Sequence, residues 1–516
     1  MTRQKISSFW LISMAAVCGA VVMAVELLGA RMLSVGYGGS LSVWASMIAV
    51  TLLSLAVGYF AGGYTADRFP KPVIVGIVAV GAGIMIAISP YLRFVLKICY
   101  HTMGIQGGAL ASSAIIFFVP LCLLGMISPF VIKLLSEKGK GIGLTAGSVY
   151  AVSTIGSVAG TLVTGLWMIP GFGIDTCFRI TALCAMIFGI IGIVLHTGLK
   201  GSPSLACIVI TLLPYSSPRI GEEYTAPDNE KTRIEAVYES PHGHITVLTK
   251  GRYRLLMVDG IVQTGIPLDL PHLVKGECLK NHYFQELIPF MVPDPSKQEV
   301  LIIGLAGGMT ASVLQKYGMK LDCVDLDPVI IEVARKWFFF TGKAEAADGR
   351  RYLESCSKQY DFCVIDTYSG DIFPFYLATI EAFTAVKKVL SERGVLVINY
   401  IGTPLGKPFR SVRATLEKVF SHTLALKGEA GDDVQTITLF ASDRVITFNR
   451  GWLDYFSDFS GVDPVSEAIH RFSIPLSGTK GLILTDNYNP IDSMRAREAL
   501  RWRERTAGRI GEKVLF

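Results

Sequence analysis

Six long apolar stretches in the first 215 residues constrain this chain more than any other feature of its sequence. Each approaches or exceeds the roughly 20 residues that a helix needs to cross a bilayer. A seventh apolar run, Ser204–Tyr215, is too short for a full span. The sequence therefore predicts an N-terminal α-helical multi-pass membrane bundle over residues 1–215. The six spans are expected at Phe9–Leu33, Leu41–Tyr64, Pro72–Tyr91, Ala109–Leu135, Ile142–Ile169 and Ile174–His196.

Charge separates this bundle from the rest of the chain. Residues 1–216 contain 12 Lys and Arg but only 4 Asp and Glu, whereas the remaining 300 residues are nearly neutral. This basic surplus is typical of a membrane protein and does not indicate a nucleic-acid partner. Eight basic residues fall on the side of the N-terminus and four on the other side, which predicts a cytoplasmic N-terminus. With six spans, the second half is also cytoplasmic. We therefore expect a multi-pass protein of the cell membrane, with the lipid bilayer as a partner.

The second half divides by composition. Residues 216–231 are polar and contain two prolines, which predicts a linker. A β-rich lead-in with a gate loop follows over residues 232–298, where three runs alternate as in a small antiparallel sheet. Residues 299–450 alternate strand and helix patterns, which predicts a Rossmann-like, doubly wound parallel sheet. Residues 451–516 are expected to form a C-terminal extension with a basic tail. Either an anionic membrane leaflet attracts this tail, or the tail is an ordinary solvated surface helix.

Acids and glycines follow the predicted parallel strands of residues 299–450. Gly304 ends the first strand, Asp325 the second, Asp348 the third and Asp366 the fourth. Ligands bind at the carboxyl ends of such strands, and a glycine lets a ligand approach the backbone. Asp325 can accept both ribose hydroxyls, and Asp348 can accept from an adenine amino group. Three acid-tipped strands favour an adenosyl-sulfonium cofactor over NAD, although ordinary strand-end caps remain an alternative. The cysteines have no metal-ligand spacing, so no metal is predicted.

Residues from about Ser240 to Tyr400 resemble the spermidine synthase (polyamine aminopropyltransferase) family, and the membrane half is similar to its membrane-fused bacterial branch. The motifs that carry the resemblance are Ser240-Pro-His-Gly-His-Ile245, Leu256-Met-Val-Asp259-Gly260-Ile-Val-Gln263-Thr264, Val300-Leu-Ile-Ile-Gly304, Val324-Asp325-Leu-Asp327, Ala347-Asp348-Gly349-Arg350 and Val364-Ile-Asp366. Thr485-Asp486-Asn-Tyr-Asn489-Pro490 is similar to the closing motif of the fused branch.

The resemblance implies a role for each matching residue. Asp366 is the catalytic aspartate that orients the attacking amine and accepts its proton. The cofactor-binding residues are Gly304, Asp325, Asp348, Gly349, Gln263 of the covering loop, and His244 in place of a glutamine. The expected substrate-binding residues are His282, Ser369 and Asp371. The implied enzyme transfers the propylamine group of decarboxylated S-adenosylmethionine to an amine, of the putrescine-to-spermidine type, and releases methylthioadenosine.

Two departures from the family pattern affect the amine half of the site. The aspartate of the family's glycine loop is Gly307 here, and the second acid of its D-x-x-D is Ser369. A cationic diamine normally needs several carboxylates. A different S-adenosylmethionine enzyme on the same scaffold, either a methyltransferase or a cofactor-cleaving enzyme, therefore stays open. So does a nucleoside sensor without catalysis. The residues do not decide whether the chain forms a homodimer.

Overall fold

The computed structural model of the protein describes residues 3–137, 141–198, 220–268, 284–368, 370, 373–428, 433–451, 464–475 and 480–510. The chain divides into two compact units. Unit 1 comprises Met1–Arg219, Tyr238–His244 and Glu512–Phe516, and unit 2 comprises Ile220–Val237 and Ile245–Gly511. The predicted short apolar run Ser204–Tyr215 lies outside the described residues.

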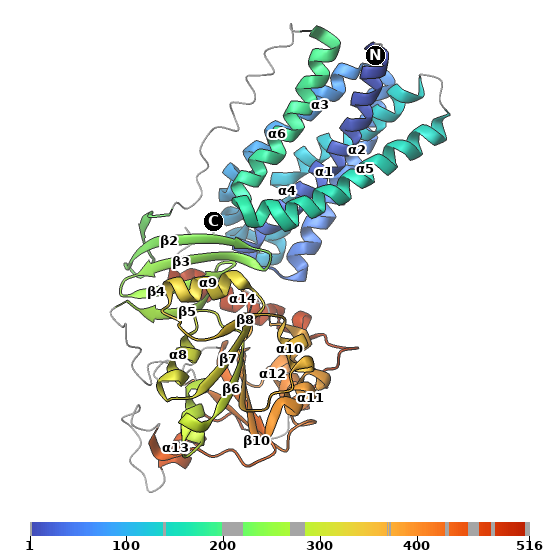
Figure 1. Ribbon diagram of the computed structural model, residues 1–516. Helices are drawn as coiled ribbons and strands as arrows, with labels where there is room; N and C mark the ends of the chain where they lie inside the picture. The colour runs from blue at the N-terminus through green and yellow to red at the C-terminus, as the bar shows by residue number, and fades with distance from the viewer. Residues whose placement is uncertain are drawn as a thin grey trace. The chain divides into compact units, whose positions relative to one another are not determined.

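Unit 1 is built from long apolar helices (Figure 1). Each predicted apolar stretch coincides with helical residues, so the helical prediction is confirmed. The helices that the structure describes are α1 (Arg3–Tyr37), α2 (Leu41–Arg68), α3 (Pro72–Ile88), α4 (Arg93–Ser136), α5 (Ile142–Val163) and α6 (Ile169–Thr197). Short 3₁₀ and π segments, Ser89–Leu92 and Thr164–Met168, connect α3 to α4 and α5 to α6.

By length and composition, four continuous helical runs in the described residues could cross a membrane. They are Ser7–Tyr37, Val43–Arg68, Pro72–Ser136 and Ile142–Thr197. The last two are much longer than one span requires. Each also contains a glycine with non-helical backbone, Gly104 (φ 68°, ψ −166°) in the first and Gly173 (φ 72°, ψ 162°) in the second. Because a run broken in this way can cross more than once, the count of six spans stays a prediction.

Small residues bring the helices of unit 1 into close contact. Gly156 and Gly160 of α5 face Ala16 and Ala20 of α1. A Cβ added at Gly156 would lie 2.0 Å from the Ala16 carbonyl oxygen, and one added at Gly160 would lie 2.4 Å from that of Ala20. Small residues four positions apart on one helix face permit this close approach. Such packing is common between helices in bilayers, where the hydrophobic effect does not drive helices together. These two glycines therefore allow α1 and α5 to pack closely.

Unit 2 begins with a five-stranded sheet in the order β1-β2-β3-β4-β5. Its strands are β1 (Glu223–Thr225), β2 (Lys231–Ser240), β3 (Gly243–Lys250), β4 (Tyr253–Val258) and β5 (Ile261–Pro267). Three of these strands match the predicted runs, and Asp259 (φ 45°) and Gly260 (φ 77°) form the turn between β4 and β5. Two predictions were wrong. Residues 223–225 of the expected linker pair with β2, and the segment with Gln263 is a strand rather than part of a loop.

A seven-stranded sheet forms the centre of unit 2, in the order β11-β12-β10-β9-β6-β7-β8. Its strands are β6 (Glu299–Ile303), β7 (Lys320–Asp325), β8 (Ala344–Ala346), β9 (Tyr360–Ile365), β10 (Leu390–Gly402), β11 (His422–Lys427) and β12 (Gln435–Ser442). The strands β8-β7-β6-β9-β10 are parallel, and their order is that of a Rossmann-like sheet. The parallel arrangement is confirmed for these five strands, whereas β11 and β12 were not predicted, and β12 runs antiparallel between β10 and β11.

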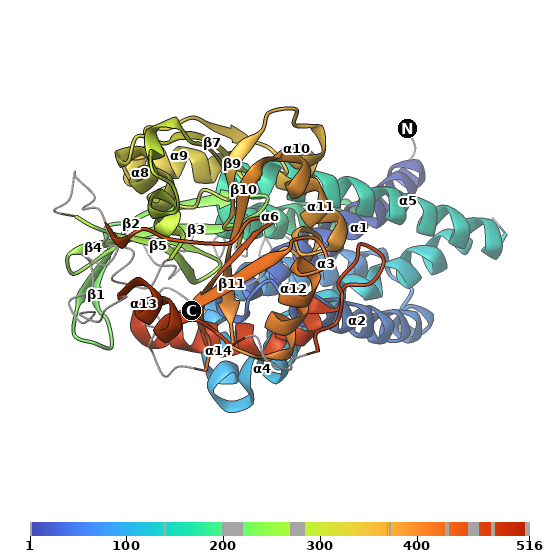
Figure 2. The ribbon, with the colours of Figure 1, turned by 90° about the horizontal axis from the view of Figure 1, so that it is seen from below.

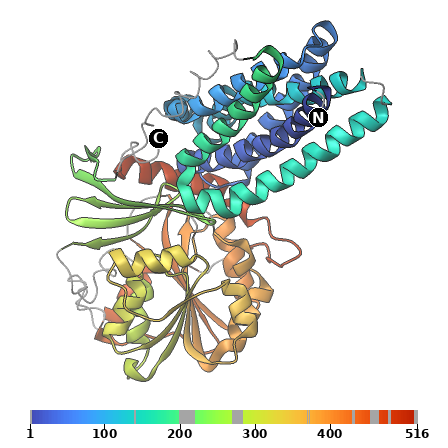
Figure 3. The same cartoon turned by 45° about the horizontal axis from the view of Figure 1, so that its top comes forward.

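Helices cover both faces of this sheet, which places apolar residues in two cores. Figure 3 shows the yellow helices α8 (Met309–Lys316) and α9 (Pro328–Trp337) on one side of the sheet, and orange helices on the other. The orange helices are α10 (Gly349–Ser355), α11 (Ile380–Val389) and α12 (Lys407–Leu416). Successive residues of β9 alternate between the two cores, as expected for a strand buried on both faces.

The described part of the C-terminal extension belongs to unit 2. Its described helices are α13 (Pro464–Phe472) and α14 (Ile491–Ile510), and α14 lies beside α12 (Figure 2). Arg495 and Arg503 of α14 are buried, with 3% and 0% of their surface exposed. The basic tail is therefore not simply a lipid-facing or solvated helix, because two of its cations lie inside the protein.

Candidate active site

The carboxyl ends of β7, β6 and β9 bring Asp325, Gly304 and Asp366 together. Ile303, the last residue of β6, is in register with Val324 of β7 and with Ile365 of β9. Gly304 N donates to Val324 O (2.8 Å), and Asp366 N donates to Ile303 O (2.9 Å). The backbone at Gly304 has φ +91°, and an added Cβ would lie 2.1 Å from Asp366 O. Only glycine fits there, so the two acids flank a bare stretch of backbone at the switch point of the sheet.

Asp325 is held in place by backbone donors. Its Oδ2 accepts from Leu305 N (2.8 Å) and its Oδ1 from Asp327 N (2.9 Å). Burial raises the pKa of Asp325, while these N–H groups oppose that rise because they stabilise the carboxylate. Leu326, the next residue, is 44% exposed and offers apolar surface beside the carboxylate. The arrangement can accept hydroxyl donors and pack against a flat apolar group.

Asp348 has a structural task in addition to its predicted one. It is the N-cap of α10, and its Oδ1 accepts from Arg351 N (2.9 Å). Burial, and to a lesser degree the Asp348 carboxylate, raise the pKa of Tyr376, which lies beside it. Gly349 is buried at the start of the same helix, where an added Cβ would lie 2.4 Å from Ile303 Cγ2. The alternative that Asp348 caps a helix is thus confirmed. Its binding of a nucleoside stays a proposal.

Asp366 accepts hydrogen bonds from two amide side chains that sequence reasoning missed. Asn399 Nδ2 lies 2.7 Å from Asp366 Oδ1, and Gln285 Nε2 lies 3.5 Å from Asp366 Oδ2. Gln285 Oε1 in turn accepts from Thr438 Oγ1 at 3.5 Å. Burial raises the pKa of Asp366, and the bond from Asn399 lowers it. A signal for Asn399 existed in the sequence, because it directly follows the apolar run Val395–Ile398.

The strand β5 reaches two loops of the site. Gln263 Nε2 donates to Gly370 O at 3.0 Å, in the loop that follows Asp366. Thr264 Oγ1 accepts from Gly307 N at 3.1 Å, in the loop that follows β6. Gln263 therefore does face the loop beyond Asp366, as expected of a covering residue, but it does so from a strand with fixed hydrogen bonds.

The structure does not test the predicted roles of the four remaining site residues. His244 is the second residue of β3 and belongs to unit 1, where its Nδ1 lies 2.6 Å from Glu239 Oε1. His282, Ser369 and Asp371 lie outside the described residues. The predicted roles of these four residues stay predictions.

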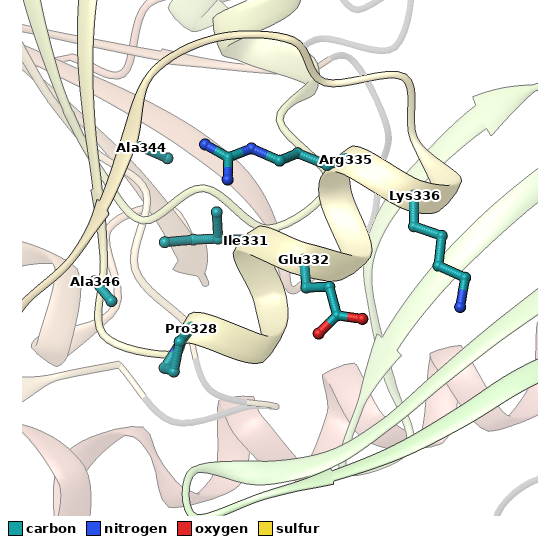
Figure 4. Close-up of a pocket in the computed structure, with 7 residues that line it drawn as sticks. All are labelled: Pro328, Ile331, Glu332, Arg335, Lys336, Ala344 and Ala346. Carbon is teal, nitrogen blue, oxygen red and sulfur yellow. The ribbon is translucent and has the colours of Figure 1, made fainter.

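A pocket of about 510 Å³ opens between α9 and β8 (Figure 4). Two of its lining residues lie near the strand-end acids in the sequence, because Pro328 is three residues after Asp325 and Ala346 is two residues before Asp348. Neither Asp325 nor Asp366 lines it. We therefore place the candidate site at the ends of β6, β7 and β9, where the chemistry-bearing groups converge. The pocket residues are Pro328, Ile331, Glu332, Arg335, Lys336, Ala344 and Ala346.

Comparison with known proteins shows what the C-terminal part of this chain is similar to. Residues 283–424 match the model described as "Spermine/spermidine synthase domain". The polyamine aminopropyltransferase of Vibrio vulnificus is 29% identical over 163 residues, which are 30% of this chain and 54% of that protein. Polyamine aminopropyltransferase 2 of Hyperthermus butylicus is 29% identical over 188 residues, covering 33% and 61%. This chain thus matches little more than half of these relatives' length.

Among solved structures, a probable spermidine synthase from Corynebacterium glutamicum aligns with a TM-score of 0.39 and 20% identity, covering 48% of this chain and 97% of that one. The family match spans η4 (Phe284–Met291), which carries Gln285, and continues through β6, β7, β9 and β10. Residues 283–424 are therefore similar in sequence to a spermine/spermidine synthase domain.

Proposed function

We propose that this chain is a membrane-anchored transferase that moves the aminopropyl group of decarboxylated S-adenosylmethionine to an amine. The amine nitrogen attacks the propyl carbon attached to the sulfonium. As the new C–N bond forms, the C–S bond breaks and its electron pair returns to sulfur, which leaves neutral methylthioadenosine. The attacking nitrogen gives up one proton. The relatives' aminopropyltransferase names and the synthase domain support this assignment.

The observation that carries the proposal is Asp366 itself, a partly buried carboxylate beside the bare backbone of Gly304. In this role Asp366 orients the amine and accepts its proton. A pKa raised by burial supports that role, because a more basic carboxylate accepts a proton more readily. Asp325 would bind the ribose hydroxyls, Leu326 would pack on the nucleoside, and Asp348 and Gly349 would lie at the adenine. His282, Ser369 and Asp371 are the proposed acceptor contacts.

The membrane half is proposed to anchor the enzyme in the cell membrane, with the N-terminus and residues 220–516 on the cytoplasmic side. The apolar helices and the Lys and Arg distribution support this arrangement. It would place the site in the compartment that supplies a nucleoside co-substrate, and close to any amine carried by a lipid.

Product analysis by mass spectrometry tests the proposal. Purified full-length protein is incubated with decarboxylated or intact S-adenosylmethionine and a panel of amines and aminolipids. We expect methylthioadenosine and an acceptor heavier by one aminopropyl group, with the decarboxylated co-substrate only. S-adenosylhomocysteine and a methylated acceptor would instead identify a methyltransferase. Nucleoside binding without any product would identify a sensor. The variant Asp366→Asn serves as the matched control in every reaction.

A further inference from the structure

The C-terminal helix α14 buries two arginines against the loops that carry the candidate catalytic groups. Arg495 and Arg503 are 3% and 0% exposed, whereas Arg497 and Arg501 on the same helix are exposed. Burying a guanidinium is unfavourable unless its charge and donors are satisfied. The partners of these two side chains therefore indicate what the helix does.

Arg495 lies among three aromatic rings. Two come from the segment after Asp366 and the third from the strand β10. Its Cζ is 5.5 Å from the ring centre of Tyr368, 5.7 Å from that of Phe373 and 5.5 Å from that of Tyr400. A guanidinium over aromatic faces is stabilised by their quadrupoles, more strongly when water is excluded. Tyr368 follows Asp366 by two residues, and Tyr400 directly follows Asn399. One cation thus contacts both segments that form the Asp366–Asn399 pair.

Hydrogen bonds fix the same two segments to each other and to α14. Arg495 Nη2 donates to Ile401 O (3.0 Å), and Ile401 N donates to the Tyr368 hydroxyl (2.7 Å). Burial raises the pKa of Tyr368 to about 12, so this hydroxyl stays protonated and neutral. Glu498, one turn along α14, accepts from Thr403 N (3.2 Å) and from the Tyr400 hydroxyl (3.4 Å).

Arg503 holds a third segment. Its Nη1 donates to Asp259 O (2.8 Å), in the turn between β4 and β5. This turn leads into β5, whose Gln263 donates to Gly370 O in the loop after Asp366. Arg495 and Arg503 lie about two turns apart on α14. One rigid helix therefore fixes both the loop after Asp366 and the strand β5, which we call the covering strand.

We propose that α14 is a positioning element of this site, in which Arg495 fixes the Asp366–Asn399 pair and Arg503 fixes the covering strand β5. This inference rests on the proposed function, because it assigns α14 to the acceptor side of the same reaction. The nucleoside side depends on other contacts, since Asp325 is held by Leu305 N and Asp327 N. Loss of Arg495 therefore slows the transfer step and leaves nucleoside binding intact.

The test compares two variants of Arg495. Arg495→Met introduces an apolar side chain of similar length, whereas Arg495→Lys keeps a positive charge among the three aromatic rings. Exposed Arg497→Met is the matched control on the same helix. We expect Arg495→Met to lower kcat about ten- to a hundredfold, with methylthioadenosine affinity within about twofold of the wild type. Arg495→Lys should recover part of kcat, and Arg497→Met should behave as wild type. Unchanged kcat in folded Arg495→Met, or an equal loss of nucleoside affinity, would overturn the proposal.

Hydrogen exchange gives a readout that does not depend on activity. In Arg495→Met, amide exchange should rise in residues 366–368 and 399–403 but not in residues 304–308 and 324–327. Arg503→Met should raise exchange in the turn at Asp259 and in β5. If the wild type turns over no amine, the proposed function fails while the exchange pattern still decides the positioning role. If Arg495→Met exchanges as the wild type does, α14 does not hold these segments.

Discussion

Asn399 Nδ2 donates a hydrogen bond to Asp366 Oδ1 across 2.7 Å, which links the carboxyl ends of the neighbouring strands β9 and β10. Because a carboxylate only accepts, the bond fixes which end of the amide faces Asp366. Asn399 Oδ1 is then buried without a hydrogen-bond partner among the residues that the structure describes. A buried acceptor beside the candidate base is suited to a substrate N–H group.

Removal of this amide should change the pH dependence of the reaction. In Asn399→Ala, burial of Asp366 is no longer opposed by the amide bond, so the pKa of Asp366 rises further. A hydrogen bond to a charged group stabilises that group by about 1.5–3 kcal/mol. The acid limb of the pH profile of kcat/KM should therefore move to higher pH. Asn399→Gln, which keeps an amide, is the control. An acid limb that stays in place would show that Asn399 does not tune Asp366.

Asp366→Asn should separate catalysis from stability. Turnover should fall about a hundredfold or more, because the amide cannot accept the proton. Calorimetry should find methylthioadenosine affinity unchanged. Because the folded pKa of Asp366 is raised, its proton favours the folded state below the unfolded pKa, and that benefit is lost as pH rises through the folded pKa. Above the folded pKa the ionised carboxylate therefore destabilises the folded state, and in that pH range Asp366→Asn should melt no lower than the wild type. Near wild-type turnover would remove Asp366 as the base and make Asp371 the next candidate.

Asp325→Ala should weaken nucleoside binding by about 1.5–3 kcal/mol, because charge-assisted bonds to the ribose are lost. The variant also leaves Leu305 N and Asp327 N without their carboxylate acceptor, so its melting temperature should fall as well. Asp327→Ala is the matched control. Asp327 caps α9 through Val329 N, so this variant should lose about 1 kcal/mol of stability and no nucleoside affinity. Undiminished methylthioadenosine affinity in Asp325→Ala would remove the nucleoside interpretation.

The membrane topology can be tested by labelling single cysteines from outside intact cells. We expect no labelling at exposed positions of residues 220–510, because six spans return the chain to the cytoplasm. Exposed sites in the loop between α1 and α2 serve as the positive control. Labelling of the second half would require an odd number of spans and would place the site away from cytosolic nucleosides.

The location of the strand-end acids was predictable from the sequence, because the carboxyl ends of parallel strands lie at the same edge of a sheet. Gly304, Asp325 and Asp366 each end a short apolar run, and parallel register alone brings them together. Asn399 and Gln285 were missed because their role depends on contacts to Asp366 across 33 and 81 residues. No local period encodes such a contact.

The surroundings of the basic helix α14 were predicted incorrectly from its composition. Its composition favours an exposed or lipid-facing helix, since Lys and Arg are rarely buried. Arg495 is nevertheless buried because three aromatic rings and a carbonyl, none of them its sequence neighbours, replace its water. The strand β5 was missed for a related reason. Its run Ile261-Val-Gln-Thr-Gly-Ile266 alternates poorly, and a register shift between Leu256 and Met257 accommodates its pairing with β4.

Gly307 provides a test of why the acid of the family's glycine loop is absent. A Cβ added there would lie 2.7 Å from Thr264 Cγ2 and 3.1 Å from Phe338 Cδ1, and Gly307 N donates to Thr264 Oγ1. Gly307→Asp alone should therefore destabilise the protein by about 1–3 kcal/mol, because an extra side chain enters a filled space beside the stiff β-branched Thr264. It should not improve use of decarboxylated S-adenosylmethionine.

Thr264→Ala removes Cγ2 and should restore room for the aspartate in the double variant. If the family's aspartate can still act here, Gly307→Asp combined with Thr264→Ala should melt above Gly307→Asp alone and show a lower KM for the decarboxylated co-substrate. Thr264→Ala by itself is the control, and it should lose only the hydrogen bond to Gly307 N. Full stability of Gly307→Asp in the wild-type background would contradict the steric argument. A double variant with recovered stability but unchanged KM would mean that this position no longer faces the aminopropyl group.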